Sequence, residues 1–316
     1  GLYALLKAEL CLHRYRYNDL TVPLVFKQRV KQHPNKPLFY FEDKSWTFEE
    51  FDVLTNKIAN FFINNGFESG DEVALFMDST PIFVAFWLAL AKCGIIPALI
   101  NNTLKMHSLA HSVNVITAKA IIFDEEMSEA VNDVIPLLNN RDSMQYFCFG
   151  ESNKPINSRF IQIMQLIERS SNADIDYRGH FTDRLFYIYT SGTSGFPKAS
   201  NIKHSRYFMM GIISHNVSFL SQDDIIYNCL PLYHSVGGGI GTCQSLVVGL
   251  TSVIRKKFSA SRFWEDCVKH NCTVALYIGE LCRYLLSQPE NSLEKQHKVR
   301  VIFGNGLRAN IWRQTE

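Results

Sequence analysis

The feature that most restricts the fold is a regular alternation of apolar strands and amphipathic helices, which begins after Gly70. Short runs of branched and aromatic residues alternate with stretches whose apolar residues recur at helical spacing. The expected order is strand 72–77, helix 80–92, strand 95–99, helix 105–117, strand 120–123 and helix 125–138. This alternation favours an α/β fold with doubly wound, mostly parallel sheets and helices on both faces.

The same rhythm resumes after residue 198. We expect helix 204–219, strand 224–229, helix 239–249, strand 251–254, helix 259–269, strand 273–278, helix 280–286 and strand 299–303. Upstream we expect helix 21–32, strand 38–41, and a helix that is capped by Thr47 and Glu50 and continues to Gly66.

Three parts are expected along the chain. Residues 1–20 form an N-terminal segment without a clear apolar period, which packs either on a membrane or on the domain. Residues 21–180 form a first α/β subdomain and residues 181–316 a second one. The boundary falls in the polar stretch 150–180, for which we expect a surface excursion with a short helix near 160–167.

Composition narrows the class of protein. With 316 residues, 47% apolar and 20% charged, the chain is typical of a globular protein rather than a disordered one. A formal charge of +2 argues against a nucleic-acid partner, and Arg255-Lys256-Lys257 is interpreted as a solvated strand end. Eight cysteines without Cys-x-x-Cys spacing favour a reducing compartment, and no metal site is predicted.

Residues 83–100 are the most membrane-like segment of the sequence. Lys92 and Gly94 interrupt the apolar run, and Pro97 prevents a continuous helix. We therefore expect a buried helix followed by a buried strand.

A loop of small hydroxyl residues and glycines follows the apolar run 185–189. Glycines allow a backbone to approach a ligand, hydroxyls donate hydrogen bonds, and a lysine offers a point charge to phosphate. The candidate phosphate-binding residues are Thr190, Ser191, Gly192, Thr193, Ser194, Gly195 and Lys198. An ordinary surface loop has a similar composition. Because Lys198 follows Phe196-Pro197 rather than a glycine, the Walker A class of nucleoside triphosphatase is disfavoured.

Two further groups follow predicted strands, at the end where ligands collect in parallel sheets. Tyr233 and His234 follow strand 224–229; the alternative is a proline-turned loop in which the histidine only packs. Gly304, Asn305 and Gly306 follow strand 299–303; the alternative is an ordinary turn.

The run from Tyr189 to Lys198 resembles the phosphate-loop signature of the adenylate-forming (acyl-activating) enzyme superfamily, with Ser194 in place of the usual threonine. Leu230-Pro-Leu-Tyr-His-Ser235 is similar to its second signature. Stretches 257–266, 277–286 and 304–308 resemble the fatty acid transport protein and very-long-chain acyl-CoA synthetase family more narrowly. The polar run 199–203 and the glycines at 237–239 depart from the family pattern, and we expect these glycines to loosen a helix on the acyl side.

The resemblance implies the large N-terminal domain of such an enzyme. The implied activity is ATP-dependent activation of long-chain or very-long-chain fatty acids through an acyl-adenylate, with Mg²⁺ as cofactor, CoA as co-substrate and a possible role in fatty acid uptake. By position, His234 inherits a catalytic role near the acyl carboxylate, Tyr233 contacts the acyl substrate, and Gly304, Asn305 and Gly306 contact adenine.

The family pattern also implies parts beyond Glu316: a magnesium-binding glutamate, a ribose-binding aspartate and a small C-terminal domain that carries the adenylation lysine. We therefore expect an incomplete N-terminal part that is inactive alone. Membrane association is expected through a missing N-terminal segment, with the catalytic domain in the cytosol at the endoplasmic reticulum, plasma membrane or peroxisome.

Other functions fit the same residues. A membrane fatty-acid carrier would need no chemistry, and a non-catalytic interaction protein would need no ATP. An aryl or amino acid could also replace the fatty acid, because the sequence does not define the acyl pocket.

Overall fold

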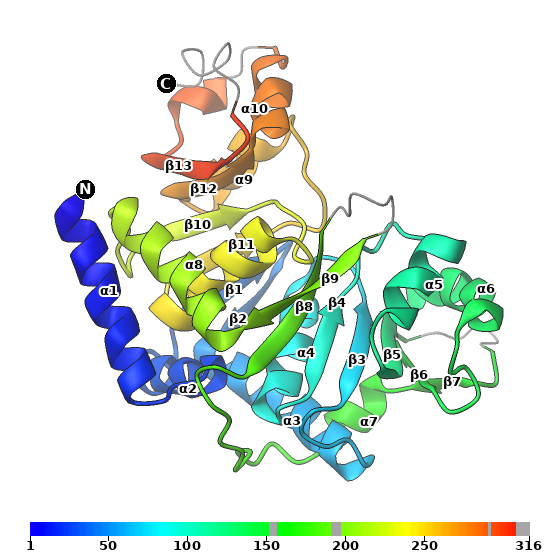
Figure 1. Cartoon of the computed structure of the whole chain (residues 1–316). Helices are drawn as coiled ribbons and strands as arrows, with labels where there is room; N and C mark the ends of the chain where they lie inside the picture. Colours follow the sequence, from blue (N-terminus) through cyan, green and yellow to red (C-terminus); the bar gives the residue numbers. More distant parts are fainter. Residues whose placement is uncertain (152–156, 191–196, 290–291, 308–316) are drawn as a thin grey trace.

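The computed structural model describes residues 1–151, 157–190, 197–289 and 292–307, and its strands form two mostly parallel sheets (Figure 1). One described sheet has the strand order β7-β6-β5-β3-β4-β8-β9, in which only β8 and β9 pair antiparallel. Its strands are β3 (Glu72–Phe76), β4 (Ile96–Leu99), β5 (Ala118–Asp124), β6 (Gln145–Phe149), β7 (Phe160–Gln162), β8 (Arg184–Thr190) and β9 (Lys198–Lys203).

The other described sheet has the order β13-β12-β10-β11-β1-β2, and only β1 and β2 pair antiparallel. Its strands are β1 (Pro37–Phe41), β2 (Lys44–Thr47), β10 (Ile225–Asn228), β11 (Thr251–Ile254), β12 (Val274–Ile278) and β13 (Val301–Asn305). Each sheet therefore contains strands that come before residue 180 and strands that come after it in the sequence. The division of the chain into two subdomains at residue 180 stays a prediction.

Helices cover both sheets, which confirms the doubly wound α/β fold (Figure 1). The α-helices are α1 (Leu2–Tyr17), α2 (Val22–Gln32), α3 (Phe48–Asn64), α4 (Pro81–Lys92), α5 (Met106–Asn114), α6 (Ser128–Val134), α7 (Met164–Glu168), α8 (His204–Val217), α9 (Phe263–Lys269) and α10 (Gly279–Leu286). The predicted start of α3 is confirmed as a capping box, because Thr47 and Glu50 each accept a hydrogen bond from the other's backbone N–H.

The structure differs from the sequence-based elements in several places, and strands β2, β6 and β9 were not among the predicted elements. Residues 2–17 form helix α1, where no element was predicted. Small or partly covered side chains along one side of this helix pack on α8. Residues 160–162 form the edge strand β7 beside β6, and the short helix predicted near 160–167 is found as α7 at Met164–Glu168. Residues 235–241 and 244–248 are π-helices, not the predicted α-helix 239–249. Strand β13 ends at Asn305, so part of the predicted adenine-contact group lies within the strand.

The centre of the molecule is α4, which is buried at every residue except the partly buried Ile82. One apolar cluster joins α4 to side chains from both sheets and from α2, α3 and α8; its largest members include Trp87, Phe26, Phe48, Phe51, Phe62, Phe83 and Phe86. The membrane-like segment is thus a buried helix followed by the buried strand β4, as predicted. Within the described residues, every helix is too short or too polar to cross a bilayer.

The last residue of α4 is a buried lysine. The ammonium of Lys92 donates to Asp52 Oδ1 at 2.7 Å, Thr55 Oγ1 at 2.7 Å and Asn56 Oδ1 at 2.6 Å, all on α3. Lys27 approaches the other oxygen of Asp52 at 2.7 Å. Burial lowers the pKa of Lys92, and the carboxylate of Asp52 opposes this effect. The network fixes α3 against α4 and satisfies polar groups that would otherwise be buried without partners.

Removal of this cation should destabilise the chain. We expect Lys92→Met to lower the free energy of unfolding by about 3 kcal/mol, because Asp52 and its neighbours lose a buried partner. Urea unfolding monitored by circular dichroism measures the change. The matched control is Lys31→Met, at an exposed position on α2, which should change stability by less than about 0.5 kcal/mol. Equal losses in both variants would contradict the role of the network.

A second buried ionisable group lies at the start of α8. His204 is 4% exposed, and its Nδ1 accepts a hydrogen bond from the backbone N–H of Val22 at 3.1 Å. Burial lowers the pKa of His204 from 6.5 to about 4, so the folded chain holds a neutral imidazole.

Because His204 is buried in its neutral form, we expect the stability of the folded chain to be sensitive to acid. Between pH 6.5 and 4 the unfolded chain binds a proton at His204 that the folded chain does not, so stability falls as the pH is lowered. We expect a loss of about 3 kcal/mol from this group across that window. His204→Asn keeps an acceptor for Val22 and should remove this part of the pH dependence, whereas His13→Asn, at an exposed site on α1, should keep it. Identical pH profiles for wild type and His204→Asn would refute the assignment.

Candidate functional site

The predicted phosphate loop begins at the last residue of β8 and ends at the first residue of β9, so it connects the two strands of a hairpin. Thr190 is the last residue of β8 and Lys198 the first of β9; the two are paired in register, and both are exposed. The Thr190 hydroxyl donates to the Lys198 carbonyl oxygen at 3.5 Å. The polar run 199–203 is explained because β9 is the edge strand of its sheet, with its exposed side chains facing solvent. Ser191, Gly192, Thr193, Ser194 and Gly195 lie outside the described residues.

Helix α5 holds the described residues on both sides of that loop. Before the loop, the Tyr189 hydroxyl donates to the Ser112 carbonyl oxygen at 2.5 Å, and burial raises the pKa of Tyr189. After the loop, His111 Nε2 lies 3.0 Å from the Pro197 carbonyl oxygen. Because a carbonyl only accepts, His111 carries its proton on Nε2 in this contact. These contacts place Lys198 at a fixed point of the sheet edge.

Tyr233 and His234 lie in the loop that follows β10. Their ring centroids are 4.6 Å apart; Tyr233 is buried, while His234 remains exposed and precedes the first π-helix. The protein atoms around His234 lower its pKa, so the imidazole is neutral at pH 7. A neutral imidazole at a strand end offers one N–H donor and one acceptor to a ligand.

Buried polar contacts fix the backbone of this loop. Asn228, the last residue of β10, donates from Nδ2 to the Gly237 carbonyl oxygen at 3.0 Å and accepts from the Leu230 N–H at 3.4 Å. The Thr242 hydroxyl donates to the Gly238 carbonyl oxygen at 2.5 Å and contacts the Tyr207 hydroxyl at 2.8 Å. The loop is therefore held by the strand before it and the helix after it.

The glycines at 237–239 lie in the first π-helix, and close backbone packing explains two of them. Their loosening of a helix on the acyl side stays a prediction. A Cβ on Gly238 would lie 1.7 Å from the Leu232 carbonyl oxygen, and a Cβ on Gly237 would lie 2.6 Å from the Pro231 carbonyl oxygen. These two residues must be glycine because their backbone packs directly on the loop. Gly239 is less restricted, since its Cβ would meet only the flexible end of Met210, at 3.1 Å.

A contact from the other sheet completes the support of the loop. The Leu232 N–H donates to the Ser79 hydroxyl oxygen at 3.0 Å, and both residues are buried. Ser79 lies between β3 and α4, where Thr80 caps α4 by accepting from the Phe83 N–H. Sequence reasoning missed Ser79 and Asn228. The sequence signal that could have identified these two residues is a small polar side chain at or just after the end of a buried strand.

Gly304, Asn305 and Gly306 lie at the same end of the six-stranded sheet as His234, because β10, β12 and β13 are parallel neighbours. A Cβ on Gly304 would lie 1.9 Å from the Tyr277 carbonyl oxygen, and Gly306 has a φ of +73°. Gly306 also packs closely on Gly279, whose Cβ would lie 1.8 Å from the Gly306 carbonyl oxygen. Backbone packing alone thus explains both glycines, and their contact with adenine stays a prediction.

A cavity of about 1300 Å³ opens at the carboxyl ends of β3, β5 and β6, and its lining includes none of the predicted site residues. Six carboxylates and two lysines line it: Asp78, Asp124, Glu125, Glu126, Glu129 and Glu151, with Lys44 and Lys256. Burial raises the pKa of Asp124 to about 7, and the Asp78 N–H donates to Asp124 at 2.7 Å. This excess of carboxylates would disfavour a polyphosphate in the cavity.

The basic triplet 255–257 supports this edge rather than forming a solvated strand end. Lys256 pairs with Asp78 at 2.7 Å and with Glu126 at 2.8 Å. Arg255, with a 15% exposed side chain, pairs with the buried Asp266 at 3.1 Å. The sequence-based interpretation of these two residues was wrong because their acidic partners are far away in sequence.

Comparison with known proteins places this geometry in a family. Residues 26–316 match the family described as AMP-binding enzyme. The chain is 42% identical over 320 residues to long-chain fatty acid transport protein 1 of Rattus norvegicus, which covers 99% of this chain and 49% of the relative. It is 31% identical to the medium/long-chain-fatty-acid–CoA ligase FadD6 of Mycobacterium tuberculosis, which covers 92% of this chain and 47% of the relative. The chain thus spans about half the length of the curated relatives it matches.

Solved structures share the fold. The N-terminal domain of FACL13 from Mycobacterium tuberculosis superposes with a TM-score of 0.82 at 18% identity, covering 93% of this chain and 72% of that chain. The anthranilate CoA ligase AuaEII, in complex with anthranoyl-AMP, gives a TM-score of 0.80 at 18% identity, covering 90% of this chain and 55% of that chain. With the strand-end loops, the fold and the match over residues 26–316 in agreement, the chain belongs to the AMP-binding enzyme family.

Proposed function

We propose that this chain forms the ATP- and acyl-binding part of a long-chain or very-long-chain fatty acyl-CoA synthetase. The observation that carries the proposal is the position of two exposed side chains: Lys198 begins β9 beside the carboxyl end of β8, and His234 follows the carboxyl end of β10. Relatives named as fatty acid transport proteins and as a fatty-acid–CoA ligase support the choice of substrate.

The reaction has two steps. A carboxylate oxygen of the fatty acid attacks the α-phosphorus of ATP, the bond to the β-phosphate oxygen breaks, and pyrophosphate leaves. The CoA thiol, after losing its proton, then attacks the acyl carbonyl, and AMP leaves. In the first step Lys198 and the hydroxyls of the loop orient the β- and γ-phosphates, while the N–H of His234 stabilises charge at the carboxylate and phosphate.

Magnesium would offset charge on the phosphates when bound. Among the described residues, no group of three or more His, Cys, Asp or Glu side chains is close enough to hold a metal ion. Mg²⁺ at nucleotide sites needs only one or two carboxylates besides the phosphates. The described residues do not define such a site, and no step is assigned to the ion.

Fatty acid uptake follows from the same chemistry. A CoA thioester carries charged phosphates and cannot leave through a membrane, so activation on the cytosolic side draws fatty acid inward. We therefore propose that the full-length protein is membrane-associated with this domain in the cytosol. The relatives' names as transport proteins support this placement and also favour the second candidate, a carrier that needs no chemistry.

The proposal requires both exposed side chains, Lys198 and His234, for formation of the acyl-adenylate. In a full-length protein that contains residues 1–316, fatty-acid-dependent exchange of labelled pyrophosphate into ATP should fall about 100-fold in Lys198→Ala and in His234→Ala. Lys198→Ala loses the cation that orients the β- and γ-phosphates, and His234→Ala loses the donor at the carboxylate and α-phosphate. The matched controls are Lys203→Ala, exposed at the other end of β9, and His107→Ala, exposed on α5; both should retain wild-type exchange.

Undiminished exchange in Lys198→Ala and His234→Ala would overturn the assigned roles. Fatty acid uptake that persists when exchange is lost would favour the carrier instead.

Substitution of the glycines that pack on the His234 loop tests the support of His234. Gly238→Ala forces a Cβ onto the Leu232 carbonyl oxygen, so we expect it to lower the free energy of unfolding by about 3 kcal/mol and to reduce exchange with it. Gly239→Ala is the matched control, since only the end of Met210 must move, and its effect should stay below about 1 kcal/mol. Thermal unfolding and exchange assays measure both variants. Equal tolerance of the two substitutions would argue against the backbone contact.

A further inference from the structure

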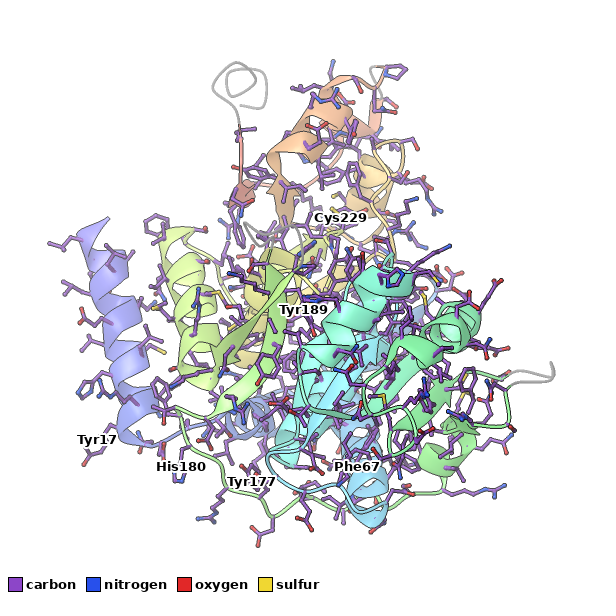
Figure 2. The ribbon with its side chains drawn as sticks, turned by 45° about the vertical axis from the view of Figure 1, so that its right-hand side comes forward. Tyr17, Phe67, Tyr177, His180, Tyr189 and Cys229 are labelled. Carbon is purple, nitrogen blue, oxygen red and sulfur yellow. The ribbon has the colours of Figure 1, made fainter. Side chains whose placement is uncertain are left out.

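Helix α1 packs on α8 through one side only. Ala4, Ala8 and Tyr15 are buried, and the Tyr15 ring lies 4.8 Å from the Phe208 ring. The opposite side carries large apolar side chains that remain exposed at helical spacing: Leu2, Tyr3, Leu6, Leu10 and Tyr17. Figure 2 shows α1 at the edge of the molecule, with side chains projecting away from the body and Tyr17 at its far end. We call these five residues the α1 apolar face.

Basic side chains flank the α1 apolar face. Lys7, Arg14 and Arg16 are exposed on the same helix, and Glu9 is the one acidic residue between positions 2 and 17. An apolar row between cations is the arrangement of a helix that lies in a membrane interface, where the apolar residues enter the acyl boundary and the cations meet anionic headgroups.

A groove of about 550 Å³ runs between α1 and α2 beside this face. Leu10, Arg14, Gln28 and Arg29 contribute to its lining. Arg29 is held in place, because it donates to the Val247 carbonyl oxygen and to Gln32 Oε1, each at 2.6 Å. Two guanidinium groups beside an exposed leucine provide donors for a phosphate next to an apolar surface.

We propose that the α1 apolar face docks on a membrane surface that contains anionic phospholipids, with Leu6 and Leu10 in the acyl boundary and Arg14 and Arg29 at headgroup phosphates. The helix lies along the surface, because its 16 residues extend about 24 Å, less than a bilayer core. A second copy of this chain fits the face less well, since its own Lys7, Arg14 and Arg16 would meet like charges. The inference rests on the membrane association proposed above but not on the acyl-adenylate chemistry.

Co-sedimentation of chain 1–316 with vesicles tests the proposal without ATP or fatty acid, so its outcome is separate from that of the activity assays. We expect binding to phosphatidylcholine vesicles that contain phosphatidylserine to be about tenfold tighter than binding to phosphatidylcholine alone, and to weaken with salt. The double variant Leu6→Asp, Leu10→Asp should lose binding to both, and Arg14→Ala should lose most of the preference for phosphatidylserine.

Matched controls are Val115→Asp and Arg178→Ala, at exposed positions away from α1, and both should bind like wild type. Circular dichroism of each variant verifies folding. The proposal is overturned if wild type does not bind vesicles, or if the α1 variants bind as wild type does. Self-association through Leu6 and Leu10, detected by sedimentation velocity, would also overturn it. So would binding of inorganic phosphate at Arg14 and Arg29 without binding of vesicles.

Discussion

The structure depends on the complete burial of α4. A helix that is apolar on every side must be covered on every side, and here the apolar cluster around α4 includes residues of both sheets. This packing brings the end of β3 to the loop after β10, where Ser79 accepts a hydrogen bond from Leu232 across the two sheets. The candidate site is thus a result of core packing. Ser79 lies just before the first turn of α4, the helix at the centre of the core, and it supports the loop that carries His234.

The loop that carries His234 is held through its backbone, and the side chain remains free to meet a ligand. Ser79, Asn228 and Gly238 contact main-chain atoms of residues 230–238 and not the imidazole. The π-helix that follows brings its glycine backbone against the carbonyl oxygens of Pro231 and Leu232, closer than any side chain would allow. π-Helical turns are rare and recur at functional sites, and here the turn has a direct structural reason.

Much of the fold could be predicted because the apolar period was strong, as in β3, α4 and β10, and the helix cap at Thr47 was readable from residues three apart. Helix α1 could not, since its buried side is made of Ala4, Ala8 and Tyr15 and most of its large apolar residues face solvent. For the site, the sequence identified the positions of Lys198 and His234 but not Ser79, whose role arises from a contact 153 residues away. Gly304 was singled out for a ligand, yet its close packing on Tyr277 is sufficient reason for a glycine there.

Charge divides the carboxyl edge of the sheets into two regions. At one, Asp78, Asp124 and Glu126 gather around Lys256, and burial, with a smaller contribution from the Asp78 carboxylate, raises the pKa of Asp124. At the other, Lys198 stands exposed on an edge strand and His234 is a neutral donor. A substrate with several phosphates would be repelled from the cavity and attracted to the hairpin, although the cavity offers far more space. The sign of the lining, rather than its volume, therefore argues against the cavity as a site for a polyphosphate.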